Sequence, residues 1–117
     1  MPRILIVEDE PIVRDLLCEI LSESYECVAA RSAEEGLKLL SESAFDIVIT
    51  DVKLPGMSGE EFLAAVSERA PGLPLIVISG GYGGDASKFL EAGAFAYLLK
   101  PFRFEELEEL VRRAIRK

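Results

Sequence analysis

The sequence contains no histidine and only two cysteines, Cys18 and Cys27. The two cysteines do not form a CxxC pair, and together with the missing histidine this argues against a zinc site. Their number alone allows one disulfide. In a chain that we expect in the cytosol, however, two free thiols are the prediction, one on a helix and one packed in a strand.

Long apolar runs are also missing, although hydrophobic residues make up 50% of the chain. No run approaches the roughly 18–20 residues of a membrane-spanning helix. The first residues lack the apolar stretch and the small-residue cleavage site of a secretory signal. These absences predict a cytoplasmic protein with no membrane contact.

Basic residues are few: the chain has 13 Lys and Arg against 21 Asp and Glu, which gives a net charge of −8. Binding to nucleic-acid phosphates needs a basic face, so direct nucleic-acid binding by this chain is not expected. The acidic balance favours a role for cations instead. The length of 117 residues suits a single domain that spans residues 1–117.

Short apolar runs recur along the chain. Such continuous runs are typical of strands that are buried on both faces, as in a parallel sheet beneath helices. The second run is shorter and weaker, which suits an edge strand. The predicted strands are Ile4–Val7, Cys27–Ala30, Ile47–Ile49, Leu75–Ile78 and Tyr97–Leu99.

The stretches between these runs carry apolar residues at helical spacing, which predicts a helix after each strand. Most of these helices have a recognisable boundary, such as a proline in the first turn or a serine followed three residues later by glutamate. The last helix, Phe104–Ile115, has only Arg103 at its N-cap, and arginine offers no acceptor there. The other boundary signals are Pro11, Ser32, Ser58, Asp85 and, as a left-handed C-cap, Gly93.

Five strand–helix repeats predict a three-layer (βα)5 α/β fold of the flavodoxin-like type. Right-handed crossovers and burial of the strongest strands favour a parallel five-stranded sheet of order 2-1-3-4-5. In such a sheet, ligands bind at the carboxyl ends of the strands, near the point where the strand order reverses.

Polar side chains follow four of the predicted strands, and the fold would bring them to that edge. Neighbouring acids repel each other, and a bound divalent cation would relieve this repulsion. Oxygen ligands without histidine or paired cysteine suit Mg²⁺, with Mn²⁺ as a substitute. The side chains are Glu8, Asp9 and Glu10 after the first strand, Thr50 and Asp51 after the third, Ser79 after the fourth and Lys100 after the fifth.

Four segments make the chain resemble the receiver domains of bacterial two-component response regulators, including the chemotaxis regulators. The segments are ILIVEDEP, DIVITDVKLPGMSG, PLIVISG and EAGAFAYLLKPF. The resemblance covers the whole chain and implies a signalling protein that accepts a phosphoryl group. It also implies that the protein is not an enzyme, although it would assist its own phosphorylation and dephosphorylation.

The resemblance implies a role for each residue at the strand ends. Asp51 would be the phosphoacceptor, with Ser79 and Lys100 contacting the phosphoryl group. Magnesium would be bound by Asp9 and Asp51 directly, by Glu8 through a water molecule, and by the backbone carbonyl of Lys53.

The resemblance also implies a cis peptide between Lys100 and Pro101 and a switch formed by Ser79 and Tyr97. The phosphoryl donor would be a sensor histidine kinase or a histidine phosphotransfer protein that docks near the first helix and the loop after the fifth strand. The signal would reach a downstream output protein or a fused output domain through the fourth helix, the fifth strand and the fifth helix. Lys88, Tyr97 and Arg113 are candidate contacts on that face.

Three other functions remain as alternatives. A phosphohydrolase of the haloacid dehalogenase type would need a second aspartate two residues after the nucleophile, where this chain has Lys53. A flavodoxin would need hydroxyl and glycine residues in the loop after the first strand, where acids stand. A pseudo-receiver that serves only for docking would not need the complete set of acceptor, hydroxyl, lysine and acids.

Overall fold

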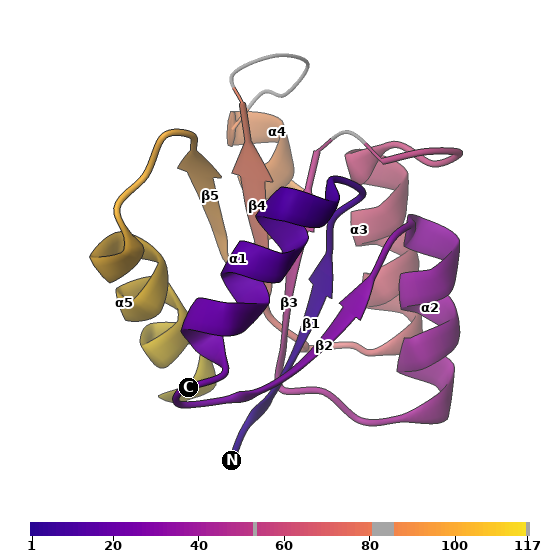
Figure 1. Ribbon diagram of the computed structural model, residues 1–117. Helices are drawn as coiled ribbons and strands as arrows, with labels where there is room; N and C mark the ends of the chain where they lie inside the picture. Colours follow the sequence, from indigo (N-terminus) through magenta and orange to yellow (C-terminus); the bar gives the residue numbers. More distant parts are fainter. Residues whose placement is uncertain (53, 81–85, 117) are drawn as a thin grey trace.

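The computed structural model describes residues 1–52, 54–80 and 86–116, which form one sheet with helices on both faces (Figure 1). Each strand is one or two residues longer than its predicted apolar run. The strands are β1 (Arg3–Val7), β2 (Glu26–Ala30), β3 (Ile47–Asp51), β4 (Leu75–Ser79) and β5 (Ala96–Leu99). The helices are α1 (Pro11–Leu21), α2 (Ala33–Glu42), α3 (Gly59–Arg69), α4 (Ala86–Glu91) and α5 (Phe104–Arg116).

All four strand pairings are parallel, and the order in the sheet is β2-β1-β3-β4-β5. The predicted fold and strand order are therefore confirmed. The weaker run, β2, lies at an edge as expected. The order reverses between β1 and β3, so the residues that follow these two strands lie side by side at the carboxyl edge of the sheet.

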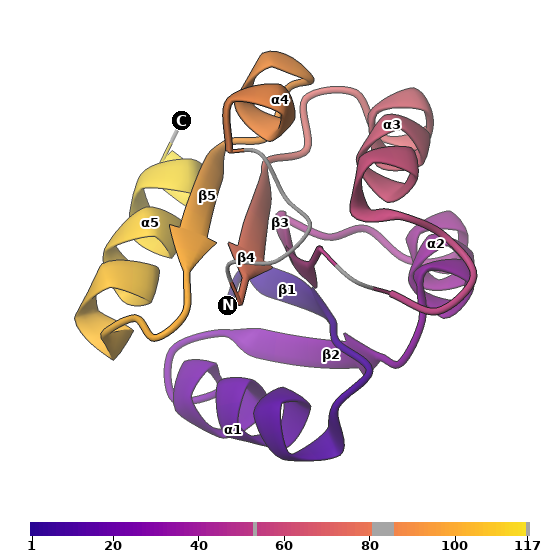
Figure 2. The same cartoon turned by 90° about the horizontal axis from the view of Figure 1, so that it is seen from above.

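Two hydrophobic clusters lie on opposite faces of the sheet. Helices α2, α3 and α4 cover one face, and α1 and α5 cover the other, as the view from above shows (Figure 2). Successive strand residues point to opposite faces. In β1, Leu5 and Val7 belong to the first cluster and Ile4 and Ile6 to the second. This two-sided burial explains why the strand runs are continuously apolar.

The helix boundaries follow the predicted signals, but the hydrogen bonds that cap α2 and α5 differ from the prediction. Ser58 forms a complete capping box with Glu61, and Pro11 stands in the first turn of α1. At the start of α2, the Ser32 hydroxyl accepts from the Glu35 N–H, but Glu35 accepts from the N–H of Arg31 rather than that of Ser32.

The start of α5 is stabilised from inside the helix. The Glu106 carboxylate accepts a hydrogen bond of 3.0 Å from the N–H of Arg103, whose own side chain has no acceptor to offer. After α4, Gly93 has φ +113, the left-handed conformation predicted for a C-cap. The predicted cap at Asp85 lies outside the described residues.

Cys18 and Cys27 are both free and partly buried. Burial raises the pKa of both thiols, that of Cys27 to about 11 with a smaller contribution from Cys18. Both thiols therefore stay protonated and unreactive near neutral pH. In the described parts of the chain, no helix has the length and apolar character needed to cross a membrane.

Candidate functional site

The polar residues predicted at the strand ends gather at the carboxyl edge of the sheet, which faces the viewer in Figure 2. Asp51 is the last residue of β3 and Ser79 the last of β4, while Glu8 and Lys100 directly follow β1 and β5. The parallel register makes this happen, because strands that run in one direction end on one side of the sheet.

Lys100 reaches two carboxylates that come from different strands. Its Nζ lies 3.3 Å from Asp51 Oδ2 and 3.8 Å from Glu8 Oε1. All three side chains are at least partly shielded from water, so these contacts are screened less than surface ion pairs. One ammonium group thus faces the charge of two acids.

Glu8 is an unusual carboxylate because it is only 2% exposed. Its Oε2 accepts a hydrogen bond of 3.1 Å from the N–H of Glu10. Burial is the largest cause that raises the pKa of Glu8, and the charge and hydrogen bond of Asp51 raise it further. The Glu10 N–H and the Lys100 ammonium lower it. The resulting pKa is about 7, against an ordinary value of 4.5.

Main-chain hydrogen bonds fix the strand ends relative to one another. The Lys100 N–H donates to the Ser79 carbonyl at 2.7 Å, and the Val52 N–H donates to the Ile78 carbonyl at 3.2 Å. The carbonyl of Val52 in turn accepts from the N–H of Gly59, at 3.1 Å. The peptide before Lys100 and the peptide after Asp51 are therefore anchored, which helps to hold both side chains in position.

The acids Glu8 and Asp51 fit a hard divalent cation, because their charges repel, they offer only oxygen atoms, and burial leaves Glu8 without water to offset its charge. Asp9, by contrast, is exposed. Within residues 1–52, 54–80 and 86–116, no three acidic, histidine or cysteine side chains group closely enough to hold a metal ion. The predicted carbonyl ligand, Lys53, lies outside the described residues.

The two residues predicted to form a switch occupy neighbouring strands. Ser79 is fully buried at the end of β4. In β5, the Tyr97 ring packs on Phe89 of α4 with 5.7 Å between ring centroids. The peptide between Lys100 and Pro101, which connects β5 to the loop before α5, is cis.

Two contacts at the site were not anticipated from the sequence. Arg14 of α1 donates from Nη1 to the carbonyl of Glu8 at 3.1 Å, and the buried Thr50 hydroxyl donates to the carbonyl of Asp51 at 3.0 Å. Both side chains hold the backbone beside an acid. The sequence did offer a signal for the first contact, because Arg14 stands one turn into the helix that follows the acids.

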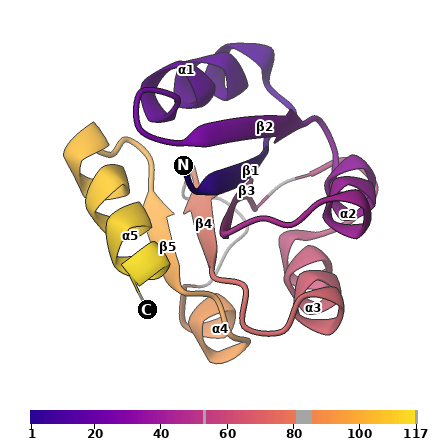
Figure 3. The same cartoon turned by 90° about the horizontal axis from the view of Figure 1, so that it is seen from below.

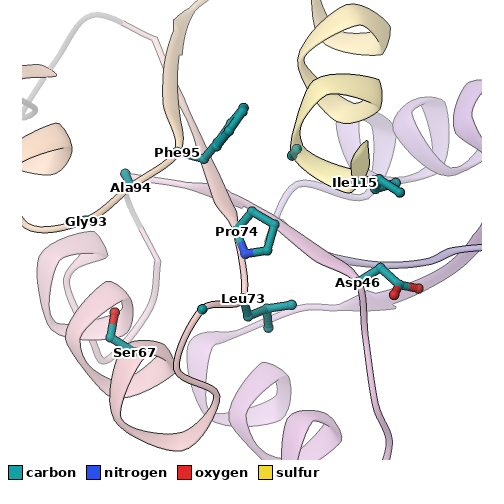
Figure 4. Close-up of a pocket in the computed structure, with 10 residues that line it drawn as sticks. Asp46, Ser67, Leu73, Pro74, Gly93, Ala94, Phe95 and Ile115 are labelled. Atoms are coloured by element: carbon teal, nitrogen blue, oxygen red, sulfur yellow. The ribbon is translucent and has the colours of Figure 1, made fainter. Parts of the chain in front are cut away.

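A hollow of about 540 Å³ lies far from these residues, at the amino-terminal edge of the sheet that Figure 3 shows from below. Asp46, Ser67, Pro74, Phe95 and Ile115 are among the residues that line it (Figure 4). Asp46 precedes β3, whereas Asp51 ends that strand, so the hollow is separated from the acidic edge by the length of the sheet. It has no part in the chemistry of the site.

Comparison with known proteins agrees with this geometry. The family model for the response regulator receiver domain matches residues 4–112. The response regulator FleR of Pseudomonas aeruginosa is 39% identical over 114 residues, which are 95% of this chain and 24% of that protein. The two-component response regulator PhoP of the same organism is 36% identical, over 98% of this chain and 52% of that protein. The chain thus spans between a quarter and a half of the length of these relatives.

Solved structures show the same likeness. A response regulator receiver domain from Clostridium thermocellum superimposes with a TM-score of 0.93 and 31% identity, over 99% of this chain and 95% of that one. The response regulator TrrA of Thermotoga maritima, solved in complex with Mg²⁺ and BeF, gives a TM-score of 0.88 and 36% identity over 97% and 99% of the two chains. The chain therefore belongs to the family of response regulator receiver domains.

Proposed function

We propose that this chain is a single receiver domain, residues 1–117, that accepts a phosphoryl group on Asp51 in the cytoplasm. The observation that carries this proposal is the position of Asp51 at the end of β3, with Lys100 Nζ 3.3 Å from one of its oxygens and the acid Glu8 beside it. A carboxylate nucleophile next to a fixed cation is the arrangement that phosphoryl transfer requires.

In the proposed step, an Asp51 carboxylate oxygen attacks the phosphorus atom of a phosphohistidine in line with the bond that breaks. A new oxygen–phosphorus bond forms, and the nitrogen–phosphorus bond breaks. Its electron pair stays on the imidazole nitrogen, which takes up a proton from solvent. The product is an acyl phosphate on Asp51 and a free histidine on the donor.

Lys100 and Ser79 are positioned to act on the transferred group. The ammonium of Lys100 would balance the negative charge that accumulates on the phosphoryl oxygens, and the Ser79 hydroxyl would donate a hydrogen bond to one of them. Both residues are held by the same main-chain hydrogen bond, from the Lys100 N–H to the Ser79 carbonyl. A fixed donor needs no reorganisation when charge develops.

Asp51, Glu8, Asp9 and the carbonyl of Lys53 are the residues that would hold Mg²⁺, with Mn²⁺ as a substitute. When bound, the ion would supply positive charge to the phosphoryl oxygens. The acidic pair supports this role, because two adjacent carboxylates, one of them buried, are better satisfied by a divalent cation than by one lysine. Asp9 would have to turn toward the pair to complete the site.

The donor, a sensor histidine kinase or a histidine phosphotransfer protein, would dock beside the acidic edge. A hollow of about 290 Å³ lies there between α1 and the loop after β5, lined by Val13, Leu16, Leu17, Pro101 and Phe102 among others. On α1, Ile12 is 82% exposed and Leu16 49%. An apolar helix face next to the nucleophile suits a helical partner that presents its own phosphorylated side chain.

The signal would leave through the face formed by α4, β5 and α5, toward an output protein or a fused output domain. Leu90 and Leu99 expose large apolar side chains on α4 and β5. The exposed cations Lys88 and Arg113 lie on α4 and α5. A mixed apolar and charged face of this kind is suited to a protein partner.

The direct test is phosphorylation with acetyl phosphate and Mg²⁺, followed by intact-mass measurement. The protein should gain one phosphoryl group, and Asp51→Asn should gain none because an amide is a poor nucleophile. Equal labelling of Asp51→Asn would show that Asp51 is not the acceptor. Multiple turnover of an added phosphomonoester by the wild-type protein would favour a phosphohydrolase instead, and no labelling at all would favour a docking pseudo-receiver.

A further inference from the structure

The contact between Phe89 and Tyr97 joins the helix α4 to the strand β5. Phe89 is 1% exposed and is one of the largest fully buried side chains in the described residues. The two rings are tilted by 36° with 5.7 Å between centroids, a geometry in which aromatic rings attract each other. The ring of Tyr97 is therefore packed against a side chain that cannot move without disturbing the core.

Phe89 also lies beside Gly59, at the start of the helix that follows Asp51. A Cβ atom placed on Gly59, the first residue of α3, would lie 3.3 Å from Phe89 Cε1 and 2.9 Å from the carbonyl oxygen of Val52. That same carbonyl accepts the Gly59 N–H. The Phe89 ring thus fills the space that a side chain on Gly59 would need. It lies beside the hydrogen bond that joins Gly59 to Val52, the residue after Asp51.

Tyr97 needs such support, because the buried position of its hydroxyl is unfavourable. Its Oη is buried and makes no hydrogen bond to any residue that the structure describes. An unpaired buried hydroxyl favours a ring position in which it meets water. Packing must therefore keep the ring inside, and the Phe89 ring is an aromatic partner in that packing.

We propose that Phe89 is a positioning residue for the switch: it stabilises the inward position of Tyr97 and couples that position to the segment after Asp51. This inference rests on the proposed function and on the switch of Ser79 and Tyr97 that the resemblance implies. It takes the phosphorylated form to have the Tyr97 ring turned inward, as it is in this structure. A ligand that favours the inward form binds more weakly when that form is less populated. Loss of the Phe89 ring should therefore weaken binding of a phosphoryl analogue at Asp51, although Phe89 does not contact it.

The test uses beryllium fluoride with Mg²⁺ as the analogue of the acyl phosphate, titrated into the whole chain and followed by NMR. In Phe89→Leu, the apparent affinity should fall about two- to tenfold, as expected from the loss of one aromatic pair. The ring signals of Tyr97 in the unligated protein should shift toward those of a solvated tyrosine. Phe89→Met serves as a second variant that keeps more of the volume.

Two controls separate coupling from general destabilisation. Phe62→Leu removes the same atoms from another buried ring in the same cluster and should leave the affinity unchanged. In a Tyr97→Ala background, Phe89→Leu should have no further effect, because the residue through which it acts is gone. An unchanged affinity in Phe89→Leu would overturn the inference. So would an equal loss of affinity in Phe62→Leu, or an equal loss when Phe89→Leu is added to the Tyr97→Ala background.

Failure of the proposed function would look different. If wild-type protein bound no beryllium fluoride in the presence of Mg²⁺, Asp51 would not be a phosphoacceptor and the inference would fall with it. If wild-type protein bound it and Phe89→Leu bound it equally well, only the role of Phe89 would be refuted.

Discussion

Glu8→Gln should make the protein more stable above neutral pH, in the absence of metal. The substitution removes a charge that is buried beside Asp51 and keeps the shape of the side chain. The amide oxygen can still accept the N–H of Glu10, as Oε2 does at 3.1 Å in the wild type. The amide NH₂ group can donate to Asp51. The variant thus replaces repulsion between two acids with a hydrogen bond.

The magnitude follows from the pKa of Glu8, which rises from 4.5 to about 7 on folding, chiefly through burial. A difference of one pKa unit corresponds to about 1.4 kcal/mol, so ionised Glu8 destabilises the fold by about 3 kcal/mol relative to its neutral form. Because the pKa in the folded state is raised, the contribution of Glu8 to stability is largest below pH 4.5 and is lost as the pH rises through 7. Glutamine does not titrate, so the advantage of Glu8→Gln should be about 1 kcal/mol at about pH 5.5 and about 3 kcal/mol at about pH 8.

The assay is urea unfolding over this pH range with a chelator present. Far-UV circular dichroism is the suitable signal, since the chain contains no tryptophan. Glu10→Gln is the matched control: Glu10 is exposed, and its variant should stay within about 0.5 kcal/mol of the wild type at every pH. Addition of Mg²⁺ should narrow the gap for Glu8→Gln, because the ion stabilises the wild type more. A gap that does not change with pH, or a wild type that is the more stable protein at about pH 8, would refute the electrostatic reasoning.

Three other predictions test separate parts of the structure. Gly59→Ala should lower the free energy of unfolding by about 1–3 kcal/mol, because its Cβ would lie 2.9 Å from the Val52 carbonyl oxygen. Gly80→Ala, whose Cβ would meet no described residue within 4 Å, should leave the free energy of unfolding unchanged; both variants are measured by urea unfolding. Asp9→Asn should weaken Mg²⁺ binding roughly tenfold in a calorimetric titration through loss of one ligand charge, and an unchanged affinity would remove Asp9 from the metal site. Ser58→Ala should cost about 1 kcal/mol of stability in thermal unfolding, since the N–H at the third position of α3 would lose its acceptor.

Most of the fold could be predicted from local patterns in the sequence. Continuous apolar runs such as Ile4–Val7 are typical of strands covered on both sides, and the serine caps at Ser32 and Ser58 fix where two helices begin. The differences occur where a boundary depends on side-chain direction. The carboxylate of Glu35 reaches Arg31 instead of Ser32, and Glu106 stabilises the helix start that Arg103 could not.

The location of the candidate site could be predicted from the sequence, but the contacts between its side chains could not. The rule that parallel strands end at one edge places Asp51, Ser79 and Lys100 together whatever the details of packing. Whether two of these groups touch depends on where each side chain points, which only the packed structure decides. Lys100 lies between Asp51 and Glu8 because the end of β5 is hydrogen-bonded to the end of β4, and that bond depends on the register of the sheet.

The sequence by itself determined the strand–helix order, the sheet topology and the collection of acids, hydroxyl and lysine at one edge, because each follows from patterns repeated along a few residues. The tertiary structure alone decided that Glu8 is buried while its neighbour Asp9 faces solvent, and that Phe89 packs on Tyr97 over Gly59. Successive side chains point in different directions, so neighbours in the sequence can differ completely in their surroundings. The pKa of Glu8 and the position of Tyr97 depend on those surroundings, and they arise only when distant segments meet.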